Sequence, residues 1–142
     1  MLKTKLDITS IQYLNLFERI TGIKTSNCFV YNNALIFVVD PSSFSRAVGD
    51  NGRNVRRLSD VIKKRVKIVM LPSGMQDADK FVRSVVYPVN FMKILVSENG
   101  EEMNIVAGPE SKAALIGRES RRLIELQKIL NIFFNIKKVK IS

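Results

Sequence analysis

Two short polar loops, each followed directly by an arginine-bearing amphipathic segment, are the parts of this chain best suited to chemistry. The first runs from Gly49 to Gly52, and the second from Gly117 to Ser120. A loop that leads into a helix presents backbone N–H groups at the positive end of the helix dipole, which favours a phosphate. Glycine at positions 49 and 52 removes side chains that would hold a sugar-phosphate chain away from the backbone. The predicted chemistry is anion binding, with no group poised to react.

The charge of the chain supports an anionic partner. Lys and Arg number 23 against 13 Asp and Glu, a net charge of +10. Residues 1–72 carry 12 basic and 5 acidic groups (+7), whereas residues 73–142 carry 11 and 8 (+3). Nucleic acid and an acidic membrane surface are the partner classes that such a balance favours.

The composition excludes several classes of function. Because the chain has no histidine, Ser-His-Asp catalysis, Cys-His catalysis and histidine metal ligation are absent. Its single cysteine, Cys28, excludes an internal disulfide and a cysteine-built metal site. We therefore expect no enzymatic activity, no metal and no cofactor.

The chain carries no long apolar segment. Its longest uninterrupted apolar run, residues 34–39, is far shorter than the roughly 20 residues of a membrane helix. Residues 1–5 lead into polar positions rather than into the apolar core of a signal peptide. We expect a cytoplasmic protein without a membrane partner.

Hydrophobic periodicity and turn residues predict the elements of the first half. In order, these are a helix ending at Gly22, strands over 24–30 and 34–39, a short helix from Pro41, a helix after Gly52 and a strand over 66–71. The second half follows the same order, with a helix over 76–87, strands over 91–96 and 103–107, a short helix from Pro109 and a helix after Ser120. Turn residues 72–74 separate the two runs, which predicts domains 1–73 and 74–142.

A fixed offset relates the two halves. Adding 68 to Pro41, Gly49, Arg53, Leu58 and Val61 gives Pro109, Gly117, Arg121, Leu126 and Ile129. The offset then grows to 73, which pairs residues 66–68 with 139–141. The second copy has therefore gained about five residues around 131–135, whose apolar side chains we assign to packing.

The placement of the first loop resembles the signature of the KH domain. Val48-Gly49-x-x-Gly52-x-x-Val55 lies between two helices after a hairpin, and the arrangement recurs. In KH domains this loop clamps about four nucleotides of single-stranded nucleic acid. The element order resembles the type II arrangement, α-β-β-α-α-β, which implies an α+β fold of two tandem domains with three-stranded mixed sheets and helices on one face.

Two tandem type II copies in a basic chain look most like an archaeal NusA-like transcription factor. That resemblance implies single-stranded RNA binding during transcription elongation, termination or antitermination, with RNA polymerase or other transcription factors as further partners, and we expect a monomer. The RNA-binding residues that it implies are Val48, Gly49, Asp50, Asn51, Gly52, Arg53, Val55, Arg56, Arg57, Ile116, Gly117, Arg118, Glu119, Ser120, Arg121 and Arg122.

Both loops depart from the family pattern. The first has Asp50 and Asn51 where KH loops usually carry a basic residue, so its affinity must come from backbone N–H groups and neighbouring arginines. The second has Arg118 but replaces the closing glycine with Ser120, and Glu119 adds repulsion. We expect the first loop to be the better clamp.

Other interpretations remain open at the level of sequence. A ribosome-associated or ribosome-assembly KH protein would use the same surface on structured rRNA. An enzyme that acts on nucleotides or phosphoesters is a further alternative, but the chain has neither a Walker motif nor an obvious acidic metal cluster. Charged helix faces can be merely solvated. Lysines 137, 138 and 140 can protect a sheet edge. The aromatic rings at 37, 91, 133 and 134 are more typical of a core than of base stacking.

Overall fold

A computed structural model of the protein describes residues 8–25 and 27–142. These residues form two compact units, one ending at Leu71 and the other beginning at Pro72. Residues 1–5, on which the absence of a signal peptide was argued, lie outside the described part.

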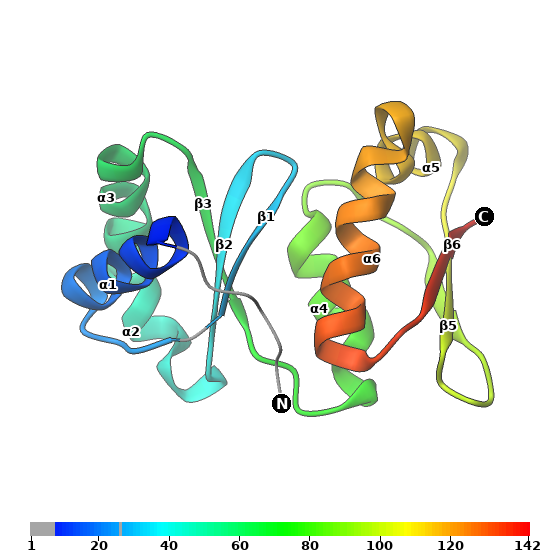
Figure 1. The fold of residues 1–142 in the computed structure, drawn as a ribbon, viewed down its shortest axis with the longest axis horizontal. Helices are drawn as coiled ribbons and strands as arrows, with labels where there is room; N and C mark the ends of the chain where they lie inside the picture. The colour runs from blue at the N-terminus through cyan, green and yellow to red at the C-terminus, as the bar shows by residue number, and fades with distance from the viewer. Residues whose placement is uncertain (1–7, 26) are drawn as a thin grey trace. The chain divides into compact units, whose positions relative to one another are not determined.

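The first unit is a three-stranded mixed sheet with helices on one face (Figure 1). The central strand β2 is antiparallel to β1 and parallel to β3, with Leu35 opposite Val66. A 3₁₀ turn over Pro41–Ser43 leads into α2. The elements are α1 (Ile8–Thr21), β1 (Asn27–Tyr31), β2 (Ala34–Val39), α2 (Phe44–Val48), α3 (Arg53–Ile62) and β3 (Arg65–Met70).

The core of this unit lies between the helices and the sheet. Every residue of β2 is buried. The rings of Phe17 from α1 and Phe37 from β2 stack with centroids 4.4 Å apart. Leu58 of α3 is fully buried in the same cluster. Phe37 is therefore a core residue, as its strand position predicted.

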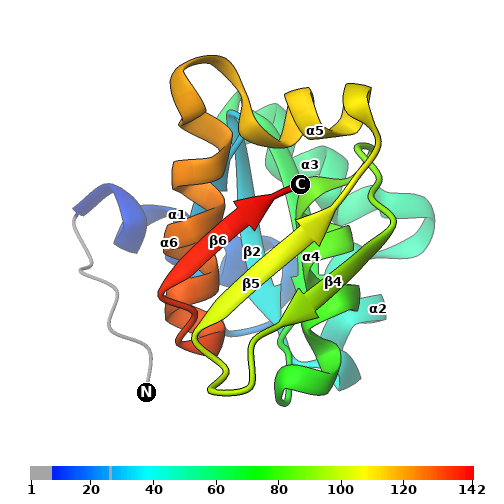
Figure 2. The same ribbon diagram turned by 90° about the vertical axis from the view of Figure 1, so that its right-hand side faces the viewer.

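The second unit repeats this plan, and Figure 2 shows its sheet with α4 and α6 behind it. Strand β5 is central, antiparallel to β4 and parallel to β6, with Met103 opposite Val139. The elements are α4 (Ala78–Val86), β4 (Lys93–Val96), β5 (Glu102–Val106), α5 (Pro109–Ile116), α6 (Arg121–Phe134) and β6 (Lys138–Ile141). The predicted α+β class, with two mixed sheets covered by helices, is confirmed.

The residues gained by the second copy lengthen its long helix. Helix α6 has 14 residues and α3 has 10, so four of the five extra residues form about one further turn. Phe133 and Phe134 at its end pack on Phe81 of α4, with centroids 5.0 and 5.7 Å apart. These two side chains therefore serve in packing, as predicted, and their contacts with Phe81 lie within the second unit.

The first strand of each hairpin begins later than the sequence predicted. We expected a strand from Lys24, but β1 begins at Asn27. The hydroxyl of Thr25 donates to the carbonyl of Val38, and the amide of Asn27 donates to the same hydroxyl at 3.2 Å. At this end of the hairpin, the Thr25 side chain therefore contacts β2 where the sequence predicted backbone hydrogen bonds. In the second unit β4 begins at Lys93 rather than at Phe91, whose ring is buried.

Candidate nucleic-acid interface

The first loop is a tight turn between α2 and α3 that depends on its two glycines. Gly49 has φ 81° and ψ 165°, Asn51 has φ 53°, and Gly52 is left-handed at φ 74°. The Gly49 amide donates to the Ser45 carbonyl at 3.0 Å, and the Gly52 amide donates to the Gly49 carbonyl at 3.1 Å. Such positive φ values favour glycine and tolerate asparagine.

The second loop has the same backbone geometry. Gly117 has φ 75° and ψ 172°, Glu119 has φ 56°, and Ser120 has φ 59°. The Gly117 amide donates to the Ala113 carbonyl at 2.9 Å, and the Ser120 amide donates to the Gly117 carbonyl at 3.2 Å. Each of these bonds has its partner in the first loop at the offset of 68. The second loop thus keeps a conformation for which Glu119 and Ser120 are poorly suited.

Two amides of the first loop and the start of α3 already have backbone acceptors. The amides of Gly52 and Arg53 donate to the carbonyls of Gly49 and Asp50. Among the described residues, the turn hydrogen bonds of this loop include none donated by the amides of Asp50 or Asn51. The anion site expected where the loop meets α3 stays a prediction.

The arginines of the first copy have different surroundings. The guanidinium of Arg56 donates to the Asn51 carbonyl, which ties α3 to the loop. Arg53 and Arg57 are exposed and lie one turn apart on α3. Only Arg56 of these three contributes to the groove described below.

The cations of the second copy are paired with acids. The guanidinium of Arg122 lies 2.5 Å from the Glu125 carboxylate, and Arg121 lies 3.8 Å from Glu119. Arg118 is exposed on the loop itself. The positive charge that could meet a phosphate is therefore weaker here than in the first copy.

A groove of about 310 Å³ runs between α3 and the edge strand β3. Val55 and Val66 give it an apolar floor, and Arg56 gives it positive charge. Burial and the neighbouring Arg65 lower the pKa of Lys67 beside it. Its full lining is Ala34, Val55, Arg56, Ser59, Arg65, Val66 and Lys67.

The apolar residues that flank the loops are half-buried. Val48 and Val55 both pack against the core of the first unit, and Ile116 has an intermediate exposure before the second loop. Of the two valines predicted to floor a groove, only Val55 lines the groove beside α3. Ser59, Arg65 and Lys67 also line it, although the loop motif did not predict them.

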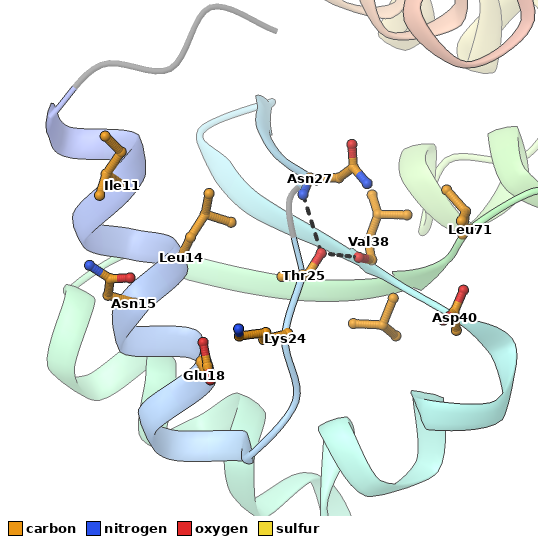
Figure 3. Close-up of a pocket in the computed structure, with 11 residues that line it drawn as sticks. Ile11, Leu14, Asn15, Glu18, Lys24, Thr25, Asn27, Val38, Asp40 and Leu71 are labelled. Carbon is orange, nitrogen blue, oxygen red and sulfur yellow. Dashed lines mark hydrogen bonds between the residues drawn. The ribbon is translucent and has the colours of Figure 1, made fainter. Parts of the chain in front are cut away.

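A second hollow of about 550 Å³ lies in the first unit between α1 and the end of β2 (Figure 3). Its charged side chains are Glu18, Lys24 and Asp40, so acids outnumber bases. In Figure 3, the hydrogen bonds of Thr25 to Val38 and Asn27 are drawn on one wall. This charge balance suits a polyanion less well than the groove beside α3.

The described residues provide neither a metal site nor a membrane span. No group of three or more His, Cys, Asp or Glu side chains is placed to hold a metal ion within 8–25 and 27–142. Over the same ranges, no helix combines the length and apolar character needed to cross a membrane.

The fold and the loops together define a class of protein. Two α+β units, each with a glycine-headed loop between its second and third helices, are consistent with tandem KH-like domains. No protein-family model matches the chain.

The chain has archaeal homologues, named "Probable transcription termination protein NusA", over nearly its whole length. The protein of that name from Methanocaldococcus jannaschii is 25% identical over 99% of this chain and 76% of its own length. The one from Halococcus morrhuae is 22% identical over 99% of this chain and 100% of its own. A solved structure entitled "Crystal structure of APE1850" is 28% identical, with a TM-score of 0.67 over 96% of this chain and 100% of that one. The resemblance to archaeal NusA-like proteins is thereby confirmed.

Proposed function

We propose that the protein is a non-catalytic single-stranded RNA-binding factor of transcription elongation or termination. The observation that carries this proposal is the repeated loop, whose dihedral angles and hydrogen bonds agree at an offset of 68 in two KH-like units. Loops of this kind hold about four nucleotides each. The names of the archaeal relatives support a role in transcription, and a factor of this kind would act in the cytoplasm.

The chemistry of the first copy suits a single strand. The loop amides of Asp50 and Asn51 meet a phosphate, while Arg53 and Arg57 supply charge beside it. The groove beside α3 offers an apolar floor to an unstacked base. Phosphate contacts position the strand, and contacts in the groove supply any base preference.

A titration with octauridine at several salt concentrations tests the proposal. Asn51→Asp places a carboxylate beside the amides of the clamp, in a residue type that tolerates φ 53°. At about 5 Å from a phosphate, this charge costs between about 1 kcal/mol in water and about 3 kcal/mol near the protein surface, or roughly 5- to 150-fold in affinity. Losing one phosphate contact also lowers the salt slope by about 0.7.

The matched control is Asn135→Asp. Asn135 is also exposed and left-handed, at φ 57°, but it lies at the opposite end of α6 from the second loop. We expect it to retain RNA affinity within about twofold, because surface charges beyond a Debye length are screened. No binding by the wild-type protein, or equal losses in both variants, would contradict the proposed function. Preference for a folded rRNA junction over octauridine would favour the ribosomal alternative.

A further inference from the structure

The two copies differ at one position of the long helix that faces the edge strand. Ser59 of α3 corresponds to Gln127 of α6 at the offset of 68. The Ser59 hydroxyl donates to the Lys64 carbonyl at 2.7 Å and stays close to its own helix end. The Gln127 side-chain amide instead donates to the Ile136 carbonyl at 3.3 Å and accepts from the Val139 amide at 2.6 Å.

The Val139 amide belongs to the outer edge of the second sheet. At the end of β6, the Ser142 amide donates toward β5, to the Ile105 carbonyl at 2.9 Å. Because backbone groups alternate along a parallel strand, Val139 points away from β5. Gln127 therefore occupies the edge of the strand and spans the space between α6 and β6.

Val66 is the counterpart of Val139 in the first copy. The Leu71 amide donates inward to the Val39 carbonyl, so alternation places the Val66 amide on the outer edge of β3. Val66 lines the groove beside α3, and so does Ser59. The shorter serine leaves this edge open where glutamine covers it in the second copy.

The side chains around this position also make the first copy more favourable for an anion than the second. Arg56 lines the open groove, whereas its counterpart at the offset of 68 is Ile124, which is 51% exposed. Ala34, also in the lining, corresponds to Glu102. The second copy has therefore lost a cation and gained an anion where a strand of nucleic acid would lie.

We propose that the Gln127 side chain closes the helix-strand groove of the second copy, so that only the first copy admits a nucleobase. The second copy then contacts RNA through phosphates at its loop alone. This inference rests on the proposed RNA binding, but the hydrogen bond between Val139 and Gln127 also predicts how fast backbone amides exchange in the RNA-free protein. An unstacked base in the first groove would meet the apolar floor and the outward backbone groups of Val66.

Amide hydrogen exchange tests the geometry without RNA. The Val139 amide should be protected in the wild-type protein, and Gln127→Ser should accelerate its exchange at least tenfold. The Val66 amide should exchange rapidly and become protected when octauridine is added. Fast exchange of Val139 in the wild-type protein, or its protection only after RNA is added, would overturn the proposal.

Binding variants test the consequence for bases. Octauridine is compared with an octamer of the same backbone that lacks bases. Ser59→Gln should weaken octauridine binding about tenfold, the scale of one good base contact, and should leave the abasic octamer within twofold.

The reciprocal variant should add a site. Gln127→Ser should tighten octauridine binding at least threefold without tightening binding of the abasic octamer, provided that thermal unfolding shows a folded second unit. If Gln127→Ser does not fold, the RNA affinity of Ser59→Gln and the amide exchange of Val66 still test the inference. Equal effects of Ser59→Gln on both octamers would refute the inference while leaving RNA binding intact, whereas a wild-type protein that binds neither octamer would refute the proposed function.

Discussion

Replacing Gly49 with alanine should destabilise the first unit more than the same change at another glycine of positive φ. Gly49 has φ 81° and ψ 165°, a combination that residues with a Cβ rarely adopt, and the cost of such a conformation is about 1–3 kcal/mol. A Cβ at this position would lie 3.0 Å from the backbone nitrogen of Asn54 and 3.1 Å from its side-chain amide. That amide donates to the Arg46 carbonyl at 3.2 Å. Displacing it costs about 1 kcal/mol more.

Gly22 provides the matched control in the same unit. It ends α1 with φ 75°, and a Cβ there would have no neighbour within 4 Å. Gly22→Ala therefore carries only the left-handed penalty of about 1 kcal/mol. We expect Gly49→Ala to lose about 2–4 kcal/mol in total.

Urea unfolding followed by circular dichroism measures both losses as shifts of the midpoint at constant m value. Because both glycines belong to the first unit, the comparison does not depend on how the second unit unfolds. Equal losses in the two variants would refute the argument, since they would mean that the loop does not approach α3 as closely as the Asn54 contacts require.

Three further predictions concern single side chains. Ser120→Gly should stabilise the second unit by about 1 kcal/mol, measured by urea unfolding, because glycine relieves the left-handed strain at φ 59°; an unchanged midpoint would contradict this. Burial raises the pKa of the Cys28 thiol to about 12, so iodoacetamide at pH 8 should label the native protein at least a hundredfold more slowly than the urea-unfolded chain, and similar rates would refute it. Hydrogen bonds from the Ser73 backbone amide and hydroxyl lower the pKa of Asp77, so its contribution to stability is present above the unfolded pKa and is lost as pH falls through the folded value. The stability difference between wild type and Asp77→Asn should therefore shrink as the pH is lowered below 3.8 in a series of urea unfolding curves, and a difference that grows would contradict the assignment.

The sequence predicts the regular elements well because their signals are local. The apolar run 34–39 coincides with β2, all six residues of which are buried. The offset of 68, growing to 73, anticipates the matching register of β2 with β3 and of β5 with β6. The start of β1 was missed because the Thr25 side chain takes the place of a backbone contact, which no periodicity reveals.

Of the candidate site, the sequence predicts the loop motif but not the contacts around it. Gly49 and Gly52 indicate a turn with positive φ, but Glu119 and Ser120 give no local sign of one, and only the repeat suggests it. The bond from Arg56 to the Asn51 carbonyl depends on how a long side chain folds back, which spacing does not determine. The groove joins α3 to a strand that follows it, so tertiary packing rather than the motif defines its lining.

The longer helix of the second copy restricts how chains of this kind can change in length. Four inserted residues advance a helix by about 400°, so the residues that follow return to within about 40° of their former direction. The left-handed residues that end the two helices, Lys63 and Asn135, are 72 positions apart, four more than the offset of 68 at which the helices begin. An insertion of one or two residues would turn the following segment by about 100° or 200° and expose the apolar face. If the copies arose by gene duplication, surviving insertions in this helix should come in whole turns, and length variation among relatives should cluster near multiples of 3.6 residues.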